Sequence, residues 1–128
     1  MKSRKEPDLA GTASPPPIDL ERLAALLGDG DETRMFGLLE IFRDLFPEML
    51  ADIGKAIDER DARRLHDAAH KAKSAANSAA APAMIDLLAQ LERDAILEDW
   101  QDFFNRWGVI QSEYTRIEDF CSGHEGQG

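Results

Sequence analysis

The chain has 128 residues, with 15 Lys and Arg against 25 Asp and Glu, and a formal net charge of −10. This length suits one domain with a modest core. The acidic excess argues against nonspecific binding to nucleic acid or to anionic membranes, because both need a cationic protein surface. No apolar run approaches the ~20 residues that span a bilayer, and no hydrophobic signal-peptide stretch precedes the domain. The single cysteine, Cys121, cannot form an internal disulfide, so we expect a cytoplasmic protein.

The two ends of the chain have the composition of tails. Residues 1–17 end in three consecutive prolines and are expected to form a disordered tail or linker. Residues 122–128 are small and polar and are expected to form a second disordered tail. The folded domain is therefore expected to span residues 18–121.

Between the tails, apolar residues recur at helical spacing in one short and four longer segments, and no strand pattern is convincing. The expected helical segments are residues 19–27, 31–59, 61–79, from 82 onward, and 98–120. Gly28 is expected to cap the end of the first segment, and Pro82 to begin the fourth. Pro47 lies inside the second segment and is expected to kink that helix or split it in two.

Short connectors between long amphipathic helices imply antiparallel neighbours. The sequence therefore predicts an all-α fold, an antiparallel up-and-down four-helix bundle with a short extra N-terminal helix across one end. Leu45 and Phe104 fall on the apolar stripes of their segments and are assigned to the core. Phe36 and Ile41 lie off the stripe of their segment, so they either contact a neighbouring helix or belong to an apolar docking patch.

The third segment has one side for the core and another for chemistry. Asp61 precedes a run without Pro or Gly and is placed to cap the helix. At 100° per residue, the core side consists of small and aliphatic residues, namely Leu65, Ala68, Ala69, Ala72, Ala76 and Ala79. His70 points almost directly away from them. Lys73, Ser74 and Asn77 share the face of this histidine.

An exposed imidazole is a good nucleophile near neutral pH and is suited to a phosphoryl group carried by another protein. Lys73 can offset the phosphate charge, while Ser74 and Asn77 add hydrogen-bond donors. No general acid accompanies them, so a self-contained hydrolase is not indicated. No Gly-rich phosphate loop is present in the sequence, so ATP binding is not expected.

His66 precedes His70 by four residues, so the two rings can share a face. A His-x₃-His pair can bind a metal, but a third ligand at a recognisable spacing is missing. A small metal-binding bundle using both histidines is therefore kept as an alternative. The preferred interpretation is that His66 is a surface residue beside a docking site, with no metal ligand in the chain.

The residues from Ala69 to Asn77 resemble the motif of the histidine phosphotransfer (HPt) domain family. The match extends upstream to Asp61 and Leu65, and downstream to a helix that ends in Leu88-Ala-Gln-Leu91-Glu92. The Phe46-Pro47 dipeptide is also similar to this family, and the resemblance covers about residues 18–121. The sequence departs from the family in three small residues. The family usually has Gly at the positions of Ser74 and Ala80 and a larger apolar residue at Ala72.

The resemblance implies a phosphorelay intermediate. His70 would accept a phosphoryl group from a receiver-domain aspartate, with Nε2 as the expected atom, and donate it to another receiver. The implied partners are response-regulator receiver domains and a histidine kinase, hybrid or not, and the chain would be a monomeric phosphocarrier rather than an enzyme. No cofactor is expected in this chain, and Mg²⁺ is expected in the receiver.

The receiver-docking face is expected to contain His66, Lys71, Ser74 and Asn77 around His70. The alternative from another functional class is a helical adaptor that binds a receiver without taking phosphate.

Overall fold

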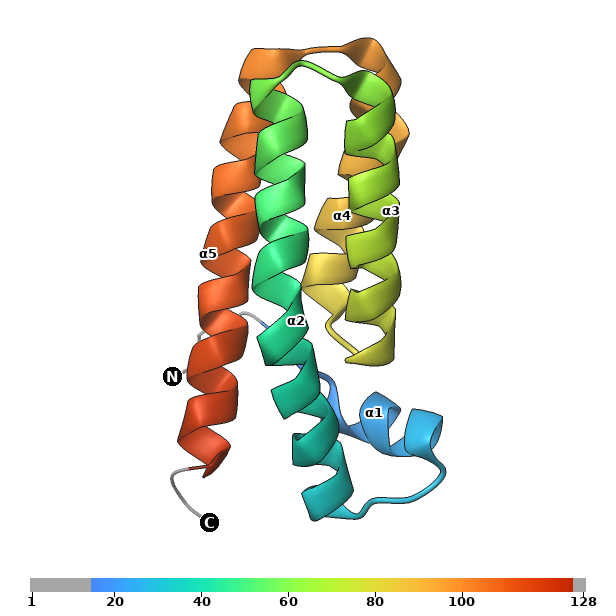
Figure 1. Ribbon diagram of the computed structural model, residues 1–128. Helices are drawn as coiled ribbons and strands as arrows, with labels where there is room; N and C mark the ends of the chain where they lie inside the picture. The colour runs from blue at the N-terminus through green and yellow to red at the C-terminus, as the bar shows by residue number, and fades with distance from the viewer. Residues whose placement is uncertain (1–14, 126–128) are drawn as a thin grey trace, which may run out of the picture.

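The computed structural model describes residues 15–125, which form five α-helices and one 3₁₀ turn and contain no strand (Figure 1). The helices are α1 (Leu20–Leu27), α2 (Glu32–Asp58), α3 (Ala62–Ser78), α4 (Pro82–Asp94) and α5 (Trp100–Glu125), with the 3₁₀ turn η1 at Ala95–Leu97. The all-α prediction is confirmed. Residues 1–14 and 126–128, which were expected to belong to tails, lie outside the described residues.

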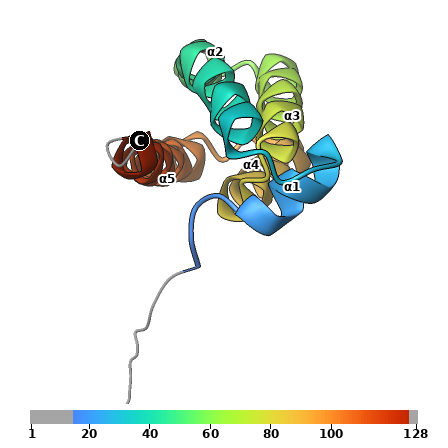
Figure 2. The same ribbon diagram turned by 90° about the horizontal axis from the view of Figure 1, so that it is seen from below.

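The four long helices lie side by side, with α3 packed between α2 and α4, and α5 packed against α2 and α4 (Figures 1 and 2). The short helix α1 contacts α2 near the lower end of Figure 1. The backbone N–H of Asp19 donates to the carbonyl oxygen of Ala80 at 2.8 Å, which ties the start of α1 to the α3–α4 turn. No helix within residues 15–125 is long and apolar enough to cross a membrane.

Aspartates begin three of the helices. The side chains of Asp19, Asp31 and Asp61 each accept a backbone N–H from the first turn of α1, α2 and α3 respectively. These contacts satisfy donors that have no partner within the helix, and such a cap stabilises a helix by about 1 kcal/mol. Gly28 ends α1 in the left-handed region at φ 87°, as expected.

Pro47 does not split α2, which is one continuous helix, so of the two predicted outcomes the split is wrong and the kink stays a prediction. A proline has no N–H, and the carbonyl oxygen of Arg43 therefore loses its usual donor one turn later in the helix. The hydroxyl of Tyr114, on α5, donates to that oxygen at 3.0 Å. A neighbouring helix thus supplies the hydrogen bond that proline removes.

The core confirms the alanine-rich side of α3, because Ala69, Ala72 and Ala76 are buried there. Two residues assigned to the core are instead exposed, Leu45 by 56% and Phe104 by 58%. Both assignments are wrong because the apolar stripes of α2 and α5 are wider than the surfaces that neighbouring helices cover.

The folded region extends beyond the predicted domain at both ends. Helix α5 continues through residues 122–125, which were assigned to the C-terminal tail. Near the other end, Pro17 is buried, and the guanidinium of Arg116 donates to the carbonyl oxygen of Pro15 at 2.8 Å. Residues at the end of the predicted N-terminal tail therefore pack against α5.

Candidate functional site

Helix α3 presents His70 to solvent. Asp61 fixes the start of this helix by accepting the N–H of Arg64 at 3.0 Å, and the alanine side faces the core. The imidazole of His70 is consequently 59% exposed. The predicted orientation of this histidine, opposite the alanines, is confirmed.

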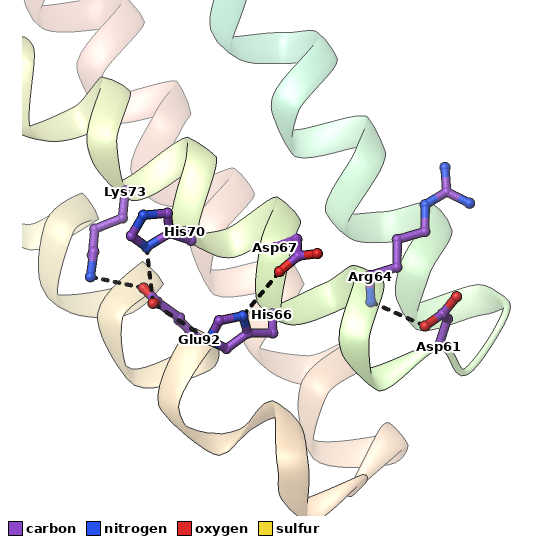
Figure 3. Close-up of polar contacts among 7 residues, drawn as sticks. All are labelled: Asp61, Arg64, His66, Asp67, His70, Lys73 and Glu92. Carbon is purple, nitrogen blue, oxygen red and sulfur yellow. Dashed lines mark hydrogen bonds and ion pairs between the residues drawn. The ribbon is translucent and has the colours of Figure 1, made fainter.

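A carboxylate from α4 contacts this imidazole. Figure 3 shows Glu92 reaching from α4 toward α3, where its Oε2 lies 3.0 Å from Nδ1 of His70. The other oxygen, Oε1, forms an ion pair with Nζ of Lys73 at 2.8 Å. The Glu92 side chain is only 16% exposed, so both contacts form at the edge of the core.

These contacts determine which ring nitrogen carries the proton when the His70 imidazole is neutral. The contact with the Lys73 ammonium lowers the pKa of Glu92 most; partial burial opposes this effect, and the hydrogen bond with His70 adds to it. An ionised carboxylate only accepts hydrogen bonds, so the proton of a neutral His70 lies on Nδ1. Nε2 then carries the lone pair on the edge of the ring that faces away from Glu92.

Lys73 lies on the predicted face, but its charge is directed at Glu92 instead of standing open to solvent. Its side chain is 27% exposed, and the 2.8 Å ion pair holds the ammonium beside α4 (Figure 3). The structure therefore brings together the predicted nucleophile and its predicted charge partner through a third residue.

His66 also lies beside Glu92. Its Nδ1 is 3.2 Å from Oδ1 of Asp67, and its Nε2 is 3.7 Å from Oε2 of Glu92. Within residues 15–125, no three His, Cys, Asp or Glu side chains are grouped so that they could hold a metal ion. The structure thus gives no observation in favour of the metal-binding alternative.

Of the other predicted docking residues, Ser74 and Asn77 lie on the His70 side of α3, whereas Lys71 is the next residue along and is turned by about 100° around the helix. The hydroxyl of Ser74 donates to the carbonyl oxygen of His70 at 3.2 Å, so its polar atom bonds to its own helix. Lys71 is exposed and Asn77 is half-buried. The serine that replaces the usual glycine is accommodated on the exposed surface of α3.

An apolar groove of about 210 Å³ lies between α2 and α3. It is lined by Ile41 and Leu45, which are 57% and 56% exposed, together with Ala75 and Ser78 of the histidine helix. Phe36, by contrast, is half-buried and packs against the core. Of the two residues off the stripe of α2, only Ile41 thus belongs to an exposed apolar surface.

Glu92 is the site residue that sequence reasoning did not assign. It lies on a different helix from His70, 22 positions along the chain, and helical spacing relates only residues of one helix. One signal was present, since Glu92 follows the core residue Leu91 and so stands at the border of the buried side of α4.

Comparison with known proteins identifies the family of this chain. The family model of the Hpt domain matches residues 37–120. The crystal structure of histidine-containing phosphotransfer protein B (HptB) from Pseudomonas aeruginosa PAO1 is similar in fold, with a TM-score of 0.77 and 22% sequence identity over 90% of this chain and 99% of that chain. A search of curated proteins found no significant match. The chain belongs to the Hpt domain family, the histidine phosphotransfer proteins of phosphorelay signalling.

Proposed function

We propose that His70 is the phosphoryl acceptor of this protein and that Nε2 is the reacting atom. The observation that carries the proposal is the 3.0 Å contact between Nδ1 of His70 and the Glu92 carboxylate. It leaves Nε2 unprotonated on a ring that is 59% exposed, within reach of a group on another protein.

The proposed transfer is a displacement at phosphorus, in which Nε2 of His70 replaces the aspartate oxygen of the receiver. The lone pair of Nε2 attacks the phosphorus of a receiver aspartyl phosphate, the N–P bond forms, and the O–P bond to the aspartate breaks. The aspartate leaves as a carboxylate, and the imidazole becomes a cation that keeps its proton on Nδ1. The reverse reaction with the aspartate of a second receiver breaks the N–P bond and restores neutral His70.

Glu92 supports this chemistry as a positioning residue. Its negative charge lies beside the Nδ1 proton and stabilises the cationic ring that forms during transfer. Lys73 further favours the ionised form of Glu92, because the ammonium contact is the largest cause of its lowered pKa. Lys73 also remains close enough to turn toward a phosphoryl group and offset its charge.

Family membership implies interaction with receiver domains and histidine kinases of two-component systems. A receiver would dock across the apolar α2/α3 groove, where Ile41 and Leu45 are exposed, and over the face that contains His66, Lys71, Ser74 and Asn77. We expect Mg²⁺ on the receiver side of this complex. This chain would contribute the nucleophile and its immediate surroundings.

The protein as a whole would act as a monomeric cytoplasmic phosphocarrier rather than as an enzyme with its own turnover. The four long helices would form an antiparallel up-and-down bundle, with α1 as a short additional helix. This arrangement is supported by the pairwise packing of α2, α3, α4 and α5.

The test is to incubate the protein with a panel of phosphorylated receiver domains. We expect phosphate on this chain that is labile in acid and stable in base, as a phosphoramidate bond is. Receiver binding without labelling by any member of the panel would contradict the proposal and support the adaptor alternative.

A further inference from the structure

A second hollow lies on the other flank of the histidine helix. This α3/α4 groove has a volume of about 820 Å³ and lies between the first half of α3 and the end of α4 with η1. Its lining includes Arg63, His66 and Asp67 on one side and Ala89 and Ile96 on the other, and the Asp67 carboxylate contacts the His66 ring at 3.2 Å. It shares no lining residue with the apolar α2/α3 groove.

The first feature of the α3/α4 groove is an arginine with no ion pair. Arg63 precedes His70 by seven positions, which places it about two helical turns away on nearly the same face. It is exposed, and it has no ion-pair partner within residues 15–125. The neighbouring Arg64 is paired with Glu59 at 2.7 Å, and Arg93 is paired with Asp94 at 2.9 Å. The positive charge of Arg63 is therefore available to an acidic group of another molecule.

The second feature is an exposed aliphatic side chain on the opposite wall. Ile96 in η1 lines the groove and is 80% exposed, and the next residue, Leu97, is 69% exposed. Single exposed aliphatic residues are common, but two adjacent ones in a short turn beside a groove offer an apolar anchor. The fold gains little from these side chains, since neither is buried.

The third feature is continuity with the site of His70. Lys73 and Glu92, which form the contacts beneath the imidazole, also line the α3/α4 groove. A partner that brings its phosphoryl group to Nε2 of His70 therefore has this groove directly beside its point of contact.

We propose that the α3/α4 groove binds a segment of the receiver partner in which an acidic side chain stands next to an apolar one. The acidic group pairs with Arg63 and the apolar group packs on Ile96. This inference rests on the proposed phosphotransfer function, because it assigns the groove to the same partner. Complementary charge at the rim of an interface acts mainly on the association rate, and apolar burial acts on the lifetime of the complex.

The test compares two variants with matched controls in single-turnover transfer from a phosphorylated receiver. Arg63→Gln is compared with Arg64→Gln, which makes the same change in net charge one residue away. Ile96→Ser is compared with Val109→Ser, because Val109 is also exposed, by 54%, but lies on α5. Circular dichroism checks that every variant retains the helical fold.

We expect the half-saturating receiver concentration to rise about threefold in Arg63→Gln and about tenfold in Ile96→Ser. The maximal transfer rate should not change, because the contacts of His70 are intact. Added salt should weaken transfer less in Arg63→Gln than in the wild type, since an ion pair has been removed.

Equal behaviour of variants and controls, with normal labelling of the wild type, would overturn this inference and leave the phosphotransfer function standing. If no receiver labels the wild type, calorimetric binding of the unphosphorylated receiver to the same four variants decides the inference separately. A wild-type dimer in light scattering that Ile96→Ser converts to a monomer would assign the groove to a second copy and overturn the proposal.

Discussion

The Nδ1 atom of His70 lies 3.0 Å from Oε2 of Glu92, although the two residues are 22 positions apart and belong to different helices. The second oxygen of this carboxylate lies 2.8 Å from Nζ of Lys73. One acidic side chain from α4 thus links the two residues of α3 that the sequence identifies as the reactive pair. The proposed chemistry of the site therefore depends on the packing of α3 against α4, and not on α3 alone.

Replacement of Glu92 should lower the rate of phosphotransfer. Glu92→Ala removes the acceptor for Nδ1–H, so the ring loses its fixed tautomer and orientation. We expect a loss of about tenfold or more in the transfer rate, the range for a lost hydrogen bond to a charged group. Glu92→Gln keeps a neutral acceptor and should be intermediate. Transfer reactions that are quenched at successive times give the rates. Equal rate losses in Glu92→Ala and Glu92→Gln would argue against the role of Glu92 as hydrogen-bond acceptor.

Replacement of Lys73 should change the pH dependence of stability. The lowered pKa of Glu92 contributes stability that is complete above the unfolded value of 4.5 and is lost as the pH falls through the lower folded-state pKa. Lys73→Met removes the largest cause of this shift. It should cost less than about 1 kcal/mol at neutral pH, and its deficit should shrink in acid.

Urea unfolding of Lys73→Met across this pH range, with carboxyl NMR titration of Glu92, measures both effects. Lys71→Met is the control, because Lys71 is exposed and has no ion pair within the described part of the chain. A pKa of Glu92 that is the same in both variants would contradict the assignment of its cause to Lys73.

The part of the site that lies on α3 can be predicted from the sequence, because one helical period relates its residues. His70, Ser74 and the alanine side of α3 belong to one helix, whose period places them relative to one another without knowledge of the fold. The contact with Glu92 depends on how two helices pack, and no periodicity encodes that register. The exposure of Phe104 was missed for a related reason, since hydrophobic spacing identifies an apolar stripe but not how much of it a neighbour covers.

The hydrogen bond from Tyr114 to the carbonyl oxygen of Arg43 should be tied to Pro47. Tyr114→Phe should cost about 1 kcal/mol, since it leaves that oxygen without the donor that replaces the missing helix N–H. In a Pro47→Ala background, the N–H of residue 47 is restored and the same change should cost less. A double-mutant cycle of urea unfolding measures the coupling. Additive effects of the two substitutions would show that the two residues act separately.

The ionisation of Tyr114 gives a separate readout of the burial of this ring. Burial raises the pKa of Tyr114 to about 12, with the charge of Glu118 adding to the effect. The protonated phenol therefore contributes stability that is complete below its ordinary pKa of 10.0 and is lost as the pH rises toward 12. Absorbance titration of the phenolate follows this loss, and an ordinary titration curve in the folded protein would contradict the burial of this ring.

Two glycines of α2 should respond oppositely to alanine. A Cβ at Gly54 would clash with the ring of Trp107, whose Cε2 would lie 2.8 Å away, so Gly54→Ala should destabilise the protein by about 1–3 kcal/mol. A Cβ at Gly37 would meet no atom within 4 Å, and Gly37→Ala should stabilise by about 0.5–1 kcal/mol. Thermal unfolding compares the two variants, and a stabilising Gly54→Ala would show that α2 and α5 are less closely packed than described.

The central claim is that His70, rather than its neighbour His66, carries the phosphoryl group. The most direct measurement is the labelling of His70→Gln and His66→Gln, side by side, by a phosphorylated receiver that labels the wild type. We predict no acid-labile phosphate on His70→Gln, and labelling of His66→Gln that reaches the wild-type extent at long incubation even where loss of a docking contact slows it, with both variants equally helical. Acid-labile phosphate on His70→Gln, or its loss from His66→Gln alone, would contradict the assignment of His70 as the acceptor.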